Sequence, residues 1–160
     1  MGLDTSHDCW HGAYSAFMNW RQMVAKAAGM PPLGFMEGYY GYTNIEHDEA
    51  KESLRSIGFA EEHVWARDIL SSFYGVGGNM PITWDSLKPA PLHVLLSHSD
   101  CEGEIPHELC DGIADELEKL LPELPEGDAP GHIRNWRDKT QTFIDGLRLA
   151  AKEKENVDFH

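Results

Sequence analysis

Apolar residues recur every three or four positions along five stretches of the chain, a spacing that predicts amphipathic helices. These stretches are residues 13–28, 48–57, 60–74, 106–121 and 133–151. Gly29 and the two prolines after it end the first helix, because glycine favours a helix C-terminus and proline cannot continue a helix. Pro106 suits the first turn of the fourth helix, and Pro122 ends that helix.

Other stretches predict strands and a loop. The mostly apolar run from Leu92 to Ser97 predicts a buried strand, and residues 2–6 are a second candidate strand. The stretch from Phe35 to Tyr42 is too rich in glycine for a stable helix and predicts a loop. The whole pattern predicts a mostly helical α+β fold, with four to five helices packed around a small two- or three-stranded sheet. We expect one domain over residues 1–160.

The composition excludes several classes of protein. The 160 residues are 41% hydrophobic and 25% charged, which is typical of a chain that folds. No apolar run approaches the roughly 20 residues that span a bilayer, and the first residues lack the features of a secretory signal. The net charge of −14 opposes general binding to nucleic acid, since phosphate contacts need a basic surface. Cysteines without a Cys-x-x-Cys pair indicate reduced thiols, so we expect a cytoplasmic protein that does not bind membranes.

Two short polar segments share a local pattern. Residues 6–9 read Ser-His-Asp-Cys, and residues 97–101 read Ser-His-Ser-Asp-Cys. Each segment follows a candidate strand and precedes a predicted helix. Segments at the C-terminal ends of strands converge on the edge where open α/β sheets usually bind ligands. The sequence therefore predicts one small-molecule site built from both segments.

Histidines and carboxylates in and beside these segments predict a divalent metal of the zinc type, because zinc is commonly bound by imidazole and carboxylate groups. The candidate metal ligands are His7, His11 and His98. Asp100 and Glu104 are candidates for a further ligand or for the general base of metal-assisted hydrolysis.

Several other residues are candidates for contacting the ligand itself. Tyr39 and Tyr40, in the aromatic loop, have rings that can stack on a planar, nucleotide-like group. Arg21 can hold a phosphate or a carboxylate, and Arg134 and Arg137 offer the same chemistry near the last helix.

Cys9 and Cys101 are also candidates for contacting the ligand, and each has two alternative roles. Either thiol can serve as a nucleophile if a histidine of the other segment activates it. Both can instead be small buried hydrophobic residues, which is the usual place of a cytosolic cysteine. Asp4, Asp8 or Asp100 can likewise act only as caps of the helices that follow them.

Three parts of the chain resemble a family of uncharacterised proteins from bacterial and bacteriophage genomes. The first is the opening Gly-Leu-Asp-Thr-Ser-His-Asp-Cys-Trp-His-Gly at residues 2–12, with its continuation through Trp20 and Arg21. The second is His-Ser-Asp-Cys-Glu-Gly-Glu-Ile at residues 98–105, and the third is residues 139–148. The resemblance implies a phage-linked role inside a bacterial host cell, and it assigns no activity to any residue.

Three functions are compatible with these observations. The first is a metal-assisted hydrolase that acts on a nucleotide-like small molecule at the junction of the two segments. The second is a non-enzymatic binder that sequesters such a molecule. The third is an acidic inhibitor that covers a basic surface of another protein by charge.

Overall fold

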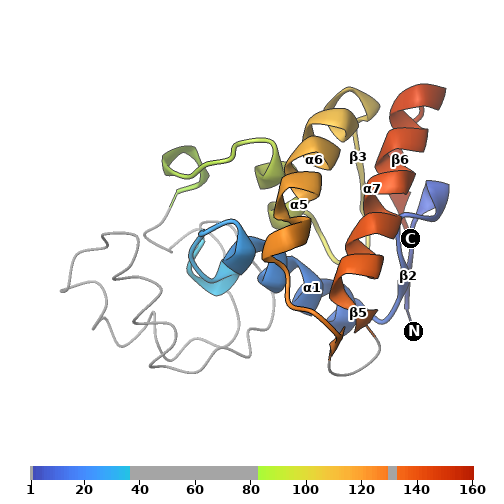
Figure 1. Ribbon diagram of the computed structural model, residues 1–160. Coiled ribbons are helices and arrows are strands. Elements are labelled where there is room, and N and C mark those ends of the chain that lie inside the picture. Colours follow the sequence, from blue (N-terminus) through green and yellow to red (C-terminus); the bar gives the residue numbers. More distant parts are fainter. Residues whose placement is uncertain (1, 37–82, 130–132) are drawn as a thin grey trace, which may run out of the picture. The chain divides into compact units, whose positions relative to one another are not determined.

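The computed structural model describes residues 2–36, 83–129 and 133–160 (Figure 1). The chain divides into two compact units, one formed by Met1–Val24 with Pro91–His160 and the other by Ala25–Ala90. The expected helices at 48–57 and 60–74 fall outside the described residues, as do Tyr39 and Tyr40. The expectation of one domain over the whole chain stays a prediction.

The helices predicted at 13–28, 106–121 and 133–151 are confirmed. They are α1 (Tyr14–Ala27), α6 (His107–Leu120) and α7 (Trp136–Glu153). Helix α6 packs along α7, and Arg148 of α7 joins the two by binding the carboxylates of Asp111, Asp115 and Glu118. None of the described helices is both long and apolar enough to cross a membrane.

The prediction of a strand at Leu92–Ser97 is wrong, because this segment forms the short helix α5. Its three buried residues are Leu92, Leu95 and Leu96, which occupy one face at helical spacing. A short apolar run has no periodicity of its own that separates a buried strand from a buried helix. The six residues of α5 therefore take the conformation that places these leucines in the core.

Short antiparallel strand pairs complete the described fold. They are β1 (Leu3–Asp4) with β2 (His11–Gly12), β3 (Gly103–Ile105) with β6 (Val157–Phe159), and β4 (Asp128–Ala129) with β5 (Arg134–Asn135). Strand β1 confirms the centre of the candidate strand at 2–6, whereas Ser6 begins a short 3-10 helix, η1 (Ser6–Asp8). The predicted mostly helical α+β class is also confirmed, with separate two-stranded pairs as its sheets.

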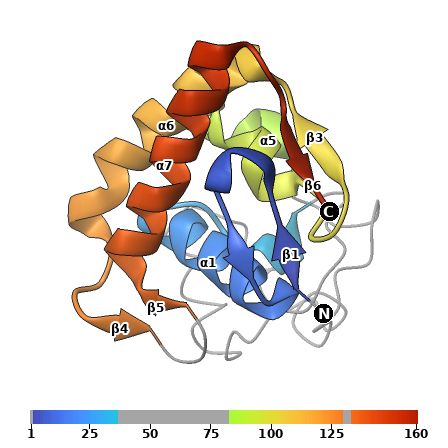
Figure 2. The ribbon, with the colours of Figure 1, turned by 90° about the vertical axis from the view of Figure 1, so that its right-hand side faces the viewer.

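Backbone hydrogen bonds join the first described residues to the last. The amide of Asp4 donates to the carbonyl oxygen of His160 at 2.9 Å, and the amide of His160 donates to that of Asp4 at 3.0 Å. Thr5 forms a β-bridge with Phe159. Strand β1 therefore lies beside β6, as Figure 2 shows, and connects the two strand pairs.

Aromatic rings form the centre of the larger unit. Trp10, Phe17, Trp20 and Phe143 are buried and contact one another, with ring centroids 5.0 Å apart for Trp10 and Phe17 and 4.7 Å apart for Trp20 and Phe143. The indole N–H of Trp20 donates to the hydroxyl of Thr140 at 2.9 Å, so this buried polar group is satisfied. The cluster fixes α1 against α7.

In the second unit, the described residues confirm the predicted end of α1. Gly29 adopts a left-handed backbone with φ of 71°, and the amide of Met30 donates to the carbonyl oxygen of Ala25 at 2.9 Å. This arrangement satisfies a carbonyl at the helix end. Met30 and Leu33 are buried beyond it.

Gly146 lets the N-terminal turn approach α7 closely. A Cβ atom at this position would lie 2.5 Å from Cys9 Sγ, 2.7 Å from the carbonyl oxygen of His7 and 2.9 Å from Cys9 Cα. Two of these three neighbours are backbone atoms, so a side chain cannot be accommodated by a rotamer change alone. The N-terminal turn can pack this closely on α7 because Gly146 has no side chain, although glycine is a poor helix former.

We expect Gly146→Ala to lower the free energy of unfolding by about 1–3 kcal/mol, the usual cost of overpacking a core. Gly112→Ala in α6 is the matched control, since its Cβ would meet only the Pro91 side chain at 3.8 Å. The control should raise stability by up to about 1 kcal/mol through helix propensity. Urea unfolding of both variants measures the difference, and equal changes would contradict the close approach.

Candidate functional site

The structure joins two predicted site residues, Arg21 and Asp100, in an ion pair. The Arg21 side chain is only 1% exposed, and its Nη2 binds the Asp100 carboxylate. Its Nη1 donates to the carbonyl oxygens of Leu96 at 3.2 Å and His98 at 2.5 Å, where α5 ends. The guanidinium also lies 4.8 Å from the Phe17 ring centroid. Arg21 therefore fastens the segment after α5 to α1.

The three candidate histidines are not gathered into one metal-binding group among the described residues. His11 is 89% exposed at its side chain, and its Nδ1 pairs with the Asp4 carboxylate. The His98 ring packs against Phe159 at a tilt of 32°, with centroids 4.0 Å apart, and its Nδ1 lies 2.9 Å from the Ser99 carbonyl oxygen. His7 turns instead to the end of α7, near Glu153.

The candidate cysteines differ in accessibility. Cys9 is fully buried, and burial raises the pKa of its thiol to about 12, so Cys9 is not a thiolate near neutral pH. Cys110 is also buried, and burial raises its pKa to about 11. Cys101 is exposed, with Sγ 3.6 Å from the Ser99 hydroxyl. Glu104 is exposed on β3, and the residue opposite it on the neighbouring strand β6 is Asp158.

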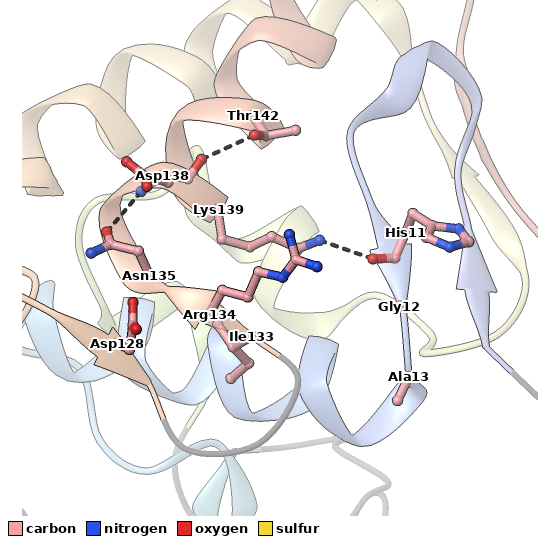
Figure 3. A pocket seen from close by; sticks show the side chains of 10 residues that line it. All are labelled: His11, Gly12, Ala13, Asp128, Ile133, Arg134, Asn135, Asp138, Lys139 and Thr142. Carbon is pink, nitrogen blue, oxygen red and sulfur yellow. Dashed lines mark hydrogen bonds between the residues drawn. The ribbon is translucent and has the colours of Figure 1, made fainter.

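A pocket of about 810 Å³ opens beside α7 (Figure 3), and most of the predicted site residues do not line it. Its walls are formed by the junction of β2 and α1, by the β4–β5 pair and by the first turns of α7. The lining residues are His11, Gly12, Ala13, Asp128, Ile133, Arg134, Asn135, Asp138, Lys139 and Thr142. His11 and Arg134 are the candidate site residues from the sequence that line this pocket.

Lys139 is held in the pocket by a hydrogen bond and by an aromatic ring. Its ammonium group donates to the carbonyl oxygen of His11 at 2.9 Å and lies 4.2 Å from the ring centroid of buried Trp10. Partial burial lowers the pKa of Lys139, and the charge of Arg134 lowers it further. No carboxylate among the described residues pairs with Lys139 to offset these effects.

Arg134 brings a second positive charge into the same pocket. Its backbone is left-handed, with φ of 65°, just before Asn135 caps α7 by accepting hydrogen bonds from the amides of Arg137 and Asp138. Within the described ranges, no ion pair or hydrogen bond engages the Arg134 guanidinium. Figure 3 shows Arg134 and Lys139 extending toward His11, whereas Asp128 and Asp138 lie on the other side near Asn135. This separation leaves one side of the pocket positively charged.

The sequence pointed to Arg134 but not to Lys139, since a lysine on a polar helix face has no distinctive pattern. Arg137, the other candidate arginine of this region, donates to the carbonyl oxygens of Pro122 and Leu124 and pairs with Glu126 at 3.4 Å. It holds the loop after α6 and does not line the pocket.

Comparisons of the chain with protein-family models, with curated proteins and with solved structures find no match. The resemblance to bacterial and bacteriophage proteins stays a prediction. The functional argument rests on the pocket, the charges around it and the polar contacts described above.

We expect Arg21→Met to lower the free energy of unfolding by about 3–5 kcal/mol, because it leaves Asp100 and the carbonyl oxygens at the end of α5 without their buried partner. Arg148→Met is the control, because its carboxylate partners lie on the surface, where ion pairs contribute at most about 1 kcal/mol. Chemical denaturation measures both values. Equal losses would show that Arg21 does not hold the fold, and would favour its predicted role in binding a ligand.

Thiol labelling tests the burial of the cysteines. In the native protein we expect a disulfide reagent such as Ellman's reagent to label Cys101 rapidly and to reach Cys9 and Cys110 only on unfolding. Mass spectrometry of the labelled peptides identifies the sites. Rapid native labelling of Cys9 would contradict its buried position and would restore it as a candidate nucleophile.

Proposed function

We propose that this protein binds a small anionic molecule in the pocket beside α7. The observation that carries the proposal is the pair of cations, Arg134 and Lys139, in a pocket where no described carboxylate pairs with either one. Like charges at short range destabilise each other, and Lys139 is also partly desolvated. An anion between them removes this strain and gains charge-assisted hydrogen bonds.

The volume of the pocket supports a ligand of small-molecule size. About 810 Å³ falls within the range of roughly 300–1,000 Å³ that is typical of small-molecule sites. Thr142, Asn135 and the carboxylates on the far side can add hydrogen bonds to polar groups of the ligand. A phosphate- or carboxylate-bearing molecule fits this chemistry, and a nucleotide-like molecule belongs to that class.

The net charge of −14 favours a small ligand over a polymer. At physiological salt, charges are screened beyond a Debye length of about 8 Å, so a small anion senses mainly the local cations. A nucleic acid extends past that distance and meets the acidic surface. The same two cations therefore support binding of a metabolite-sized anion and oppose binding of a polyanion.

Among the functions expected from the sequence, the sequestering binder receives more support than the hydrolase. The candidate catalytic residues Asp100 and Glu104 do not line the pocket, and Asp100 is engaged by Arg21. Metal-assisted hydrolysis at the junction of the two polar segments stays an alternative prediction. It would require a substrate at that junction and would not depend on Lys139.

Calorimetric titration with adenosine monophosphate, citrate and inorganic phosphate tests the proposal. We expect at least one of these probes to bind, and Arg134→Gln or Lys139→Gln to weaken its binding by about tenfold, as loss of one charge-assisted contact implies. Lys152→Gln, at the exposed far end of α7, removes the same charge outside the pocket and should leave affinity unchanged. Equal weakening by all three variants would indicate general charge attraction and contradict the site.

Sulfate is a useful probe of pH dependence, because its charge is constant between pH 7 and 10. Sulfate binds the protonated form of Lys139, so affinity should be highest below the lowered pKa of this lysine. It should fall as pH rises through that pKa, within the range below the ordinary value of 10.5. Lys139→Gln should show a flat profile. A fall of the same size in that variant would assign the titration to another group.

A further inference from the structure

An unusual backbone places His7 against the C-terminal end of α7. His7 and Asp8 both adopt the left-handed region, with φ of 57° and 53°, although neither is glycine. Such residues persist only where their surroundings hold them, and they cluster at functional sites. The His7 side chain is only 7% exposed, which is unusual for an imidazole next to two glutamates.

Ser6 holds the His7 ring and the last strand together. Its hydroxyl accepts from the amide of Asp158 at 2.9 Å and donates to the carbonyl oxygen of Asn156 at 3.3 Å. The same hydroxyl lies 2.9 Å from His7 Nδ1. Nδ1 is therefore engaged inside the fold, and Nε2 is the ring nitrogen that faces α7.

His7 Nε2 faces two carboxylate groups at the end of α7. His7 Nε2 lies 3.4 Å from a carboxylate oxygen of Glu153 and 3.5 Å from one of Glu155. Ionised carboxylates only accept hydrogen bonds. One imidazole nitrogen and two carboxylate oxygens thus converge on one point, which is how ligand atoms are arranged around a metal ion.

The distances favour the metal ion. In a tetrahedral zinc site with bonds of about 2.1 Å to nitrogen and oxygen, neighbouring ligand atoms lie about 3.4 Å apart. The nitrogen–oxygen separations here are 3.4 and 3.5 Å, and all three ligand atoms lie within 4.8 Å of one another. We propose that His7, Glu153 and Glu155 bind a divalent transition metal ion, with zinc as the best fit.

The proposed metal site is distinct from the anion pocket. Lys139 and Glu153 are 14 positions apart in α7, which corresponds to about 21 Å along the helix axis. A metal ion at His7 cannot contact a small ligand beside Lys139, so this inference does not rest on the proposed function. One imidazole and two carboxylates leave a fourth position for water. The ion also fastens the N-terminal turn to the end of α7.

Calorimetric titration of untagged, chelator-treated protein with Zn²⁺ tests the site. We expect one equivalent to bind, and the double variant Glu153→Gln, Glu155→Gln to weaken Zn²⁺ affinity at least tenfold. Both glutamates are exposed, so the double variant should still fold, as circular dichroism will show. Co²⁺ in place of Zn²⁺ should give the intense visible absorption of a four-coordinate centre in the wild type and lose it in the double variant.

His11→Gln and Glu104→Gln are the matched controls, because they remove a histidine and a carboxylate that the structure places outside the cluster. Both should bind Zn²⁺ within twofold of the wild type. The proposal is overturned if the wild type binds no Zn²⁺. It is also overturned if the double variant binds as the wild type does, or if either control loses the ion.

Discussion

The close approach of residues 5–10 to Gly146 is the contact on which the larger unit depends. Without a side chain at Gly146, the carbonyl oxygen of His7 and the thiol of Cys9 come directly against the α7 backbone. This contact brings the His11 carbonyl within reach of Lys139 on one side and His7 within reach of Glu153 on the other. Helix α7 therefore positions the N-terminal turn and both groups of polar residues at once.

The two polar clusters near the ends of α7 differ in charge and in chemistry, although the helix also carries Asp138 in its first turn and Lys152 in its last. Near its N-terminus, Arg134 and Lys139 accumulate positive charge that attracts an anion. Beyond its C-terminus, Glu155 joins Glu153 in presenting negative charge to His7, which attracts a cation. Both clusters place charges where the helix dipole does not favour them, since cations are favoured at the C-terminal end and anions at the N-terminal end. Such unfavourable charges are typical of sites whose full set of partners includes a ligand.

The sequence predicted the long helices well and the site only in part. Periodic apolar residues and proline or glycine ends determine α1, α6 and α7 locally. The prediction of a strand at Leu92–Ser97 is wrong because a buried strand and a buried helix can both place such a short apolar run in the core. The pairing of Arg21 with Asp100 and of His7 with Glu153 joins residues far apart in the chain, and no local pattern predicts which distant partner a polar group will meet. Lys139 became notable only through its burial beside Trp10.

The hydrogen bonds between Asp4 and His160 also bear on how the chain folds during synthesis. Strand β1 pairs locally with β2, but its other neighbour β6 and the helix α7 that contacts the N-terminal turn come more than a hundred residues later in synthesis. At about 5–20 residues per second, that delay is on the order of ten seconds. During this interval the buried surface of Trp10 and Phe17 is exposed on the nascent chain. The larger unit therefore completes its core only after α7 and β6 have been synthesised.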